Sequence, residues 1–211
     1  PPRPEERGSA LLCGLAQVAV MAVELLIGAQ IFYALAFHLF PWVLRLLGLI
    51  PTVLLMPAIG FALALLWLPI GLGSVILAKR LLIGRYTAGQ HPVWGGVYLR
   101  HWLLAHLNLG VPWRLLGGTV FLNAALRMLG ARIGPRVHIH GGVALGAWDL
   151  IDIGPDVSLG RDVALRSVDF RDQTMFLGPI RIGAGATLDT RAGVGHHTDI
   201  GAGACLAPLA L

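Results

Sequence analysis

A period of six residues in the C-terminal part constrains this sequence more than any other feature. From Ile133 onward, each unit opens with an aliphatic residue, usually followed by glycine, and has a small or β-branched residue in fifth place. Eight clean units begin at residues 133, 139, 153, 159, 182, 188, 194 and 200. Such hexapeptide repeats are typical of a parallel β-helix, in which the first and fifth side chains fill a narrow prism and glycine eases the tight corners. The sequence therefore predicts an all-β parallel β-helix over residues 131–211, truncated at its C-terminus.

The register of the repeat predicts how the coils are phased. Three coils are expected over residues 133–150, 153–170 and 182–199, with a partial fourth from residue 200. Residues 151–152 are extra between the first two coils, and an insertion over residues 171–181 separates the second from the third.

One corner of the predicted prism breaks the pattern. The fifth residue is valine or alanine in the first two units of each coil, but in the third units it is Asp149, Asp169 and Thr198. A carboxylate that points into an apolar prism is unfavourable. We therefore expect the chain to leave the ideal coil at this corner and to turn the two carboxylates outward.

The N-terminal third accounts for most of the unusual composition, which is 56% hydrophobic and 13% charged. Residues 9–40 contain one formal charge, Glu24, and residues 46–78 contain none. Because about 20 apolar helical residues cross a bilayer, we predict a two-helix transmembrane hairpin over residues 9–85, with its turn at residues 41–45 and a linker over residues 1–8. A buried helix pair of a soluble protein is the alternative. Glu24 is either a functional intramembrane residue or an interface residue.

Positive charges predict how these spans are oriented. They flank the two spans at Arg3, Arg7, Lys79, Arg80 and Arg85, whereas the turn holds only Arg45. Because positive residues stay on the cytoplasmic side, we expect a multi-pass membrane protein with its β-helix on that side. Residues 86–130 mix aromatic, basic and leucine residues and are predicted to form interfacial and connecting helices, one of them over residues 113–129. Ordinary packing of these helices on the β-helix is the alternative.

Several function classes lack support in the sequence. The net charge is +5 without a continuous basic stripe, so no nucleic-acid partner is expected. Two cysteines, Cys13 and Cys205, are too few for a disulfide framework. No phosphate-binding loop, HExxH or GxSxG motif occurs. His138 and His140 are expected to point outward, and the histidines form no compact ligand set that would predict a metal site.

The hexapeptide repeat resembles the left-handed β-helix acyltransferase superfamily, from about Met128 to the end. More narrowly, four motifs resemble the C-terminal region of poly-lysine synthetase-type non-ribosomal peptide synthetases, which alternates membrane helix pairs with acyltransferase-like domains. These motifs are LGARIG at 129–134, VHIH at 137–140, WDLIDIG at 148–154 and LDTRAGV at 188–194.

This resemblance implies a left-handed β-helix with no firmly bound cofactor and a thioester donor, either a phosphopantetheine carrier or acyl-CoA. It also implies a general-base histidine that acts on the acceptor. The implied partners are upstream adenylation and carrier domains of the same polypeptide, membrane lipid, and a second copy of the chain in a homo-oligomer.

The irregular corner of the prism is the candidate site. His196 and His197 are the candidate bases, because the pKa of an imidazole lies near neutral pH, and Asp169 is the candidate residue that orients them. The candidate substrate-binding residues of the same corner and its insertion are Trp148, Asp149, Arg171 and Asp172. Solvated turns with structural aspartates are the alternative interpretation.

Three functions remain open at this point. The first is a membrane-anchored aminoacyl-transfer module of a non-ribosomal peptide synthetase, which makes peptide or isopeptide bonds from carrier-bound amino acids. The second is a free-standing CoA-dependent acetyltransferase, for which a trimer is expected. The third is a non-catalytic β-helix platform.

Overall fold

The computed structural model describes residues 8–210, without the side chains of residues 144 and 145. The chain forms two compact units: residues 9–70 make up one, and the other holds Gly8 and the described chain from Gly71 onward. The predicted linker over residues 1–8 lies, except for Gly8, outside the described residues.

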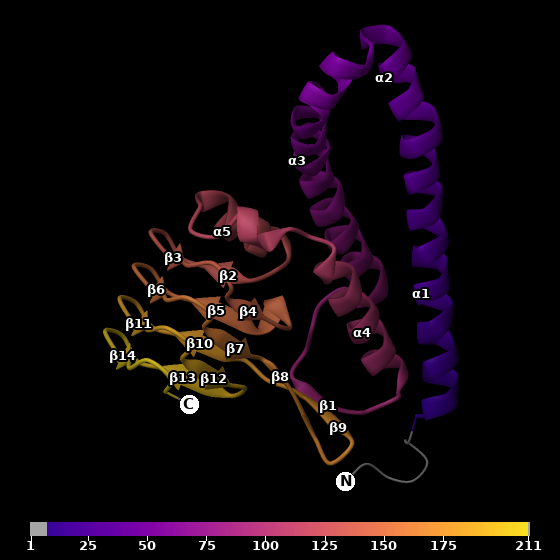
Figure 1. The fold of residues 1–211 in the computed structure, drawn as a ribbon. Helices are drawn as coiled ribbons and strands as arrows, with labels where there is room; N and C mark the ends of the chain where they lie inside the picture. The colour runs from indigo at the N-terminus through magenta and orange to yellow at the C-terminus, as the bar shows by residue number, and fades with distance from the viewer. Residues whose placement is uncertain (1–7, 211) are drawn as a thin grey trace. The chain divides into compact units, whose positions relative to one another are not determined.

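Two long apolar helical stretches form the N-terminal part. α1 (Ala10–Tyr33) continues through a π-helical segment, η2 (Ala34–Leu39), into α2 (Phe40–Leu47), and α3 spans Leu49–Leu82 (Figure 1). The first stretch has 38 residues and the second 34, and both are long and apolar enough to cross a membrane by length and composition. The two predicted apolar helices are therefore confirmed as helices.

The predicted turn at residues 41–45 is wrong, because these residues are helical. In a regular α-helix, the ring of Pro41 would clash with the carbonyl four residues earlier. The π-helical segment η2 contains Phe37, whose carbonyl lies four residues before this proline, and it widens the helix there. The helix is interrupted only at Gly48, whose φ of +79° is accessible to glycine without strain.

The segment between α3 and the repeat contains short elements. They are β1 (Gly89–Pro92), α4 (Gly96–Leu109), the 3-10 helix η3 (Trp113–Leu115) and α5 (Val120–Met128). The helix predicted over residues 113–129 is thus interrupted. The reason is local: Gly117 lies against Gly141 of the repeat, and Gly118 has a φ of +74°.

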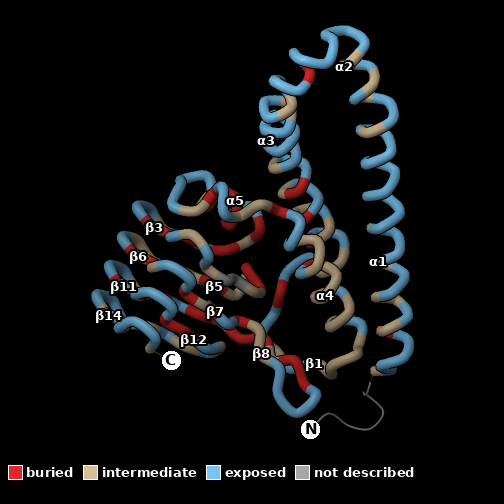
Figure 2. The backbone as a smooth tube through the Cα atoms, in the orientation of Figure 1, coloured by how far each residue is buried: buried red, intermediate tan, exposed pale blue. Residues whose placement is uncertain are grey.

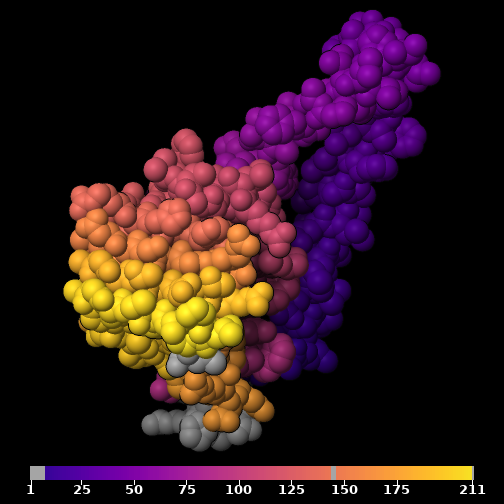
Figure 3. Space-filling view, turned by 60° about the vertical axis from the view of Figure 1, so that its left-hand side comes forward, coloured from indigo at the N-terminus to yellow at the C-terminus, as the bar shows by residue number. Residues whose placement is uncertain are grey.

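Residues from Arg132 onward build three parallel sheets, which the chain visits in a fixed order (Figure 1). The first sheet contains β2 (Arg132–Ile133), β5 (Ile151–Ile153), β10 (Ile180–Ile182) and β13 (Thr198–Ile200). The second contains β3 (His138–Ile139), β6 (Ser158–Leu159), β11 (Thr187–Leu188) and β14 (Cys205–Leu206). The third contains β4 (Ala144–Leu145), β7 (Ala164–Arg166) and β12 (Gly193–Gly195). Successive passages of the chain stack as bands in Figure 3.

The predicted phasing of the repeat is confirmed by the strand register. Ile153 pairs with Ile133 on one side and with Ile182 on the other, and Ile182 pairs with Ile200. The opening aliphatic residues and the small fifth residues form the buried core between the sheets (Figure 2). Among them, Leu159, Val163, Ala186, Leu188 and Ala192 are completely buried.

The glycine that follows the opening aliphatic residue has a different role from the one the sequence suggested. A Cβ on Gly154 would lie 2.8 Å from the backbone nitrogen of Ala184 in the next passage, so this position needs glycine for close stacking. The corner itself lies two residues later and is taken by Asp156 with a φ of +58°, or by Gly185 at the equivalent place. Glycine is thus required where strands stack and is optional at this corner.

The insertion in the repeat is an antiparallel hairpin. β8 (Val168–Arg171) and β9 (Thr174–Leu177) pair with each other, and β9 also pairs with β1. The hairpin begins three residues before the predicted insertion, so Asp169 lies on a hairpin strand instead of at the corner of a coil. The sheets of the described chain are therefore both parallel and antiparallel.

Candidate functional site

The structure brings the predicted base and orienting residues together. His196 and His197 are the two residues between β12 and β13, and Asp169 lies on β8. The Nε2 of His196 is 3.9 Å from an Asp169 carboxylate oxygen, and its Nδ1 is 3.2 Å from the Nδ1 of His197. Arg171 donates from Nε to the same Asp169 oxygen at 2.7 Å. We refer to Asp169, Arg171, His196 and His197 as the histidine cluster.

The hairpin supports the two imidazoles from one side. The ring of Phe176 on β9 stacks on His196, with centroids 5.9 Å apart and an interplanar angle of 17°. Gly178, directly after β9, leaves no room for a Cβ, which would collide with the ring of His197 and lie 2.9 Å from the Cβ of His196. The insertion therefore determines where the histidines lie.

The contacts of the cluster allow the following proton arrangement, in which the direction of the His196–His197 contact is assigned from the charge of Asp169. Partial burial raises the pKa of Asp169, but the Phe170 amide, Arg171 and His196 together lower it below its usual range, so the carboxylate is charged at neutral pH. An ionised carboxylate favours a proton on the nearer nitrogen of His196, its Nε2. The Nδ1 of His196 then accepts from the Nδ1–H of His197, and the exposed His197 retains a lone pair on Nε2. This arrangement suits a general base.

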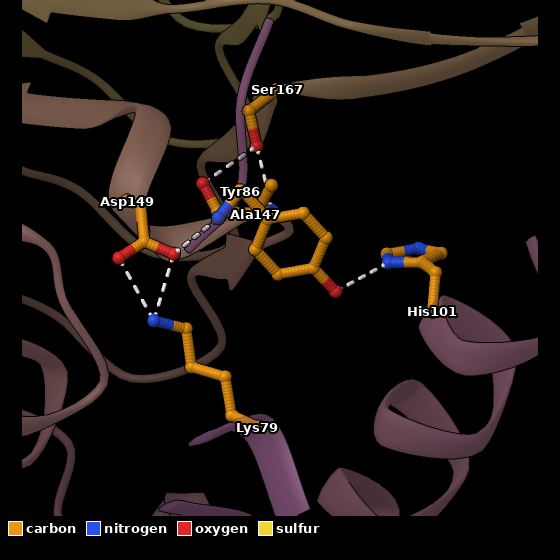
Figure 4. Close-up of polar contacts among 6 residues, drawn as sticks. All are labelled: Lys79, Tyr86, His101, Ala147, Asp149 and Ser167. Atoms are coloured by element: carbon orange, nitrogen blue, oxygen red, sulfur yellow. Dashed lines mark hydrogen bonds and ion pairs between the residues drawn. The ribbon is translucent and has the colours of Figure 1, made fainter. Parts of the chain in front are cut away.

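Asp149 lies in a different and buried cluster (Figure 4). Its carboxylate oxygens are 2.8 and 2.7 Å from the Nζ of Lys79, and one of them accepts the Tyr86 backbone N–H at 3.0 Å. The side chains of Lys79 and Asp149 are 7% and 11% exposed. Gly130, with a φ of +105°, lies against the pair and leaves no room for a Cβ. Asp149 thus leaves the repeat, as expected, at the 3-10 helix Trp148–Leu150, but it is covered by Lys79 of α3 instead of being solvated.

The same region contains further buried polar contacts (Figure 4). The Tyr86 hydroxyl is 2.8 Å from the Nδ1 of His101, and the buried Ser167 hydroxyl accepts the Ala147 N–H at 2.9 Å. Burial, and secondarily Asp149, raises the pKa of Tyr86, and burial lowers the pKa of His101. Tyr86, His101 and Ser167 were not predicted as functional residues, since isolated residues of these types carry no spacing pattern. Lys79 entered the sequence prediction only as one of the positive charges that indicate membrane topology.

The remaining candidate residues line two pockets. Arg171 and Asp172 border a shallow pocket of about 320 Å³ together with Tyr98 and Phe170. Trp148 is buried and lines another pocket, of about 280 Å³, which His140 also borders. The single predicted corner is thus divided among the histidine cluster, the Lys79–Asp149 cluster and the Trp148 pocket. Within residues 8–210, no group of three His, Cys, Asp or Glu side chains is placed to hold a metal ion.

Comparison with known proteins finds similarity to a synthetase. The chain is 32% identical over 181 residues to the delta-poly-L-ornithine synthetase of Acinetobacter baumannii (strain AB307-0294). The match covers 81% of this chain but only 12% of that protein, so the chain spans about an eighth of the length of this relative. No protein-family model and no solved structure matches. The similarity suggests that the chain is related to one region of a peptide-forming synthetase.

Proposed function

We propose that this chain is the membrane-anchored aminoacyl-transfer module of a non-ribosomal peptide synthetase. The observation that carries the proposal is the similarity along 81% of the chain to a delta-poly-L-ornithine synthetase. That name denotes a polymer in which side-chain δ-amines are joined to carboxyl groups. The reaction proposed for this chain is therefore transfer of an aminoacyl group from a carrier thioester to an amine, with upstream adenylation and carrier domains as partners.

The architecture supports this proposal. The three parallel sheets and their six-residue period favour a left-handed β-helix of the hexapeptide acyltransferase type, and the hairpin β8–β9 is an insertion between two of its coils. The two apolar helices would form a multi-pass anchor. The basic residues at the far ends of both helices favour a cytoplasmic repeat domain.

The histidine cluster supports a mechanism by general base catalysis. Asp169, with an oxygen 3.9 Å from the Nε2 of His196, favours a proton on that nitrogen, and His196 in turn orients His197 through Nδ1. The Nε2 of His197 takes a proton from the acceptor amine while the amine nitrogen attacks the thioester carbonyl. The C–N bond forms, the C–S bond breaks, and the proton passes from His197 to the leaving thiolate, so His197 returns to its starting state.

The shallow pocket beside the cluster supports a role for Asp172 in substrate binding, whereas Arg171 borders the pocket but pairs with Asp169. Phe170 and Tyr98 present aromatic rings there, 6.1 Å apart between centroids. A carboxylate and aromatic faces both attract an ammonium group. Asp149 has no place in this mechanism, because Lys79 and the Tyr86 amide already use its oxygens.

The test uses the chain in lipid nanodiscs with lysyl- or ornithyl-S-pantetheine as donor and free ornithine as acceptor, and measures amide product by mass spectrometry. His197→Gln is expected to lower the rate about 100-fold, the lower end of what a general base contributes. His138→Gln changes an exposed histidine on β3 and is the matched control.

The same assay separates the alternatives. An acetylated product from acetyl-CoA, formed by a trimer, would favour a CoA-dependent acetyltransferase. Equal product from the wild type and His197→Gln, including none from either, would favour a non-catalytic platform and reject the proposal.

A further inference from the structure

A pocket apart from the histidine cluster lies between the connecting segment and the first strands of the repeat. Its volume is about 280 Å³, and a water molecule occupies about 30 Å³ in the liquid, so the pocket has room for several methylene groups. Its apolar lining includes Leu122 and Leu126 of α5, Ile139 of β3, and Trp148. None of these four is more than 7% exposed, so the apolar lining is held in place by the surrounding core.

Three polar side chains border this apolar lining, and each can donate a hydrogen bond. Arg114 contributes an exposed guanidinium. The Nδ1 of His140 accepts the Gly141 N–H at 2.9 Å, so in this arrangement the ring carries its proton on Nε2 and can donate it. Asn108 accepts the Trp113 indole N–H at 3.1 Å through Oδ1, which leaves its amide NH₂ as a donor.

The residues described in the lining of this pocket carry positive but no negative formal charge. Among the described residues that line it there is no aspartate or glutamate. Asp162 lies against Gly142 at its edge, but this carboxylate is 3.9 Å from the guanidinium of Arg191 on the next passage. Donors without a carboxylate beside them favour an anionic ligand group, and the apolar lining favours a hydrocarbon chain on the same ligand.

Exposed apolar side chains adjoin several lining residues in the sequence. Leu109 and Leu115 follow Asn108 and Arg114 directly in the sequence and are 80% and 58% exposed. Val120 and Phe121, at the start of α5, are 76% and 68% exposed. Exposed apolar residues next to basic ones are typical of surfaces that contact the headgroup region of a membrane. The two apolar helices of the same chain favour a location at a membrane.

We propose that this pocket binds an anionic phospholipid, with one acyl chain on Leu122, Leu126, Ile139 and Trp148 and the phosphate held by Arg114, His140 and Asn108. The site shares no residue with the histidine cluster, so it does not depend on the proposed transfer activity. Such a site would let the segment between α3 and the repeat bind anionic lipids selectively, because the headgroup contacts discriminate by charge.

The experiment is photo-crosslinking of the complete chain in phosphatidylcholine nanodiscs that contain a trace of diazirine-labelled phosphatidylglycerol, followed by peptide mass spectrometry. Adducts are expected on peptides containing residues 122–126 or 139–148. Arg114→Gln changes an exposed side chain and is expected to lower these adducts about fivefold or more. Adducts on α1 and α3 should be unchanged and serve as the internal reference.

Two further variants make the result specific. Val143→Phe narrows the pocket without altering a basic residue and should also remove the pocket adducts. Arg136→Gln, an exposed arginine that pairs with Asp156, should leave them unchanged. Equal pocket labelling by diazirine-labelled phosphatidylcholine, or unchanged labelling in Arg114→Gln, would overturn the proposal. Complete displacement by inorganic phosphate would also overturn it, because it would show an anion site that does not hold an acyl chain.

Discussion

Lys79 and Asp149 lie 70 residues apart in the sequence and form a direct ion pair from which solvent is almost wholly excluded. The ammonium lies within 2.8 Å of both carboxylate oxygens, and the Tyr86 amide donates to one of them. A buried ion pair offsets the loss of hydration only when its geometry is good and its other hydrogen-bonding groups are satisfied. This pair meets both conditions.

Removing one charge of this pair should strongly destabilise the unit that contains the repeat. Asp149→Asn keeps an acceptor for the Tyr86 amide but leaves the Lys79 charge buried without its partner. We expect a loss of about 3–5 kcal/mol in the free energy of unfolding, measured by urea titration of tryptophan fluorescence in detergent micelles. The double variant Lys79→Met/Asp149→Asn should recover most of this loss. Arg136→Gln, in an exposed pair, should leave the midpoint unchanged, and an unchanged midpoint for Asp149→Asn would contradict the prediction.

The stability of the unit that contains the repeat should fall in mild acid, because the partly buried His101 is then protonated more readily in the unfolded chain. Burial lowers the pKa of His101 below its ordinary value of 6.5. Between the folded pKa and 6.5 the unfolded chain binds more protons than the folded chain, so the free energy of unfolding rises with pH in that range. The contribution of neutral His101 to the free energy of unfolding is complete above about pH 6.5 and is lost as the pH falls below this value.

The measurement is the melting temperature between about pH 7.5 and about pH 5. His101→Phe should make this dependence shallower, although it also removes the partner of the Tyr86 hydroxyl. His138→Gln changes an exposed histidine and should keep the wild-type slope. A His101→Phe curve parallel to that of the wild type would show that another group is responsible.

Gly178→Ala should disturb the histidine cluster without unfolding the repeat. The added methyl group would meet the ring of His197, which can rotate away, and would lie 2.9 Å from the Cβ of His196, which can move only with its backbone. We therefore expect a modest fall in the melting temperature with the repeat still folded, and a loss of transfer approaching that of His197→Gln. Gly201→Ala, where the methyl group meets open space, is the matched control. Full activity in Gly178→Ala would show that the position of His197 does not matter.

The tip of the hairpin should become more stable when its two turn residues are replaced. Asp172 and Gln173 have φ values of +47° and +58° between the paired residues Arg171 and Thr174. A two-residue turn of this kind prefers Asn-Gly. Asp172→Asn/Gln173→Gly should raise the free energy of unfolding by about 0.5–1 kcal/mol, visible as a higher melting temperature.

The same two positions separate stability from substrate binding. If Asp172 holds the ammonium group of the acceptor, Asp172→Asn should raise its KM, whereas Gln173→Gly alone should leave KM unchanged. An equal KM for both variants would remove Asp172 from the binding site.

The repeat could be predicted from the sequence because its information is local and periodic. Ile133, Ile153, Ile182 and Ile200 are recognisable as equivalent residues without a structure, and the strand register agrees. The hairpin was less predictable, because an 18-residue coil counted from Ile153 extends through Phe170, whereas β8 already begins at Val168. The start of the insertion was therefore placed too late.

The site was predictable only where it follows the repeat. Asp169, His196 and His197 lie in the third units of successive predicted coils, so the phasing assigned them to the same corner before the hairpin was known. Asp149 fills the corresponding place in the first coil, but its partner is a lysine 70 residues earlier. A contact over that separation leaves no periodic signal, and a buried lysine cannot be distinguished in the sequence from a charge that flanks a membrane helix.

The separation of Lys79 from Asp149 also determines the sequence of events during synthesis. Ribosomes add about 5–20 residues per second, so Lys79 is synthesised roughly 4–14 seconds before Asp149. During this interval the lysine lacks the carboxylate that neutralises it in the folded chain. The first passage of the repeat can dock only afterwards, and it closes the ion pair as it does so. Translation therefore imposes an order of assembly in which α3 is made first and its ion pair forms only after the first passage of the repeat has been synthesised.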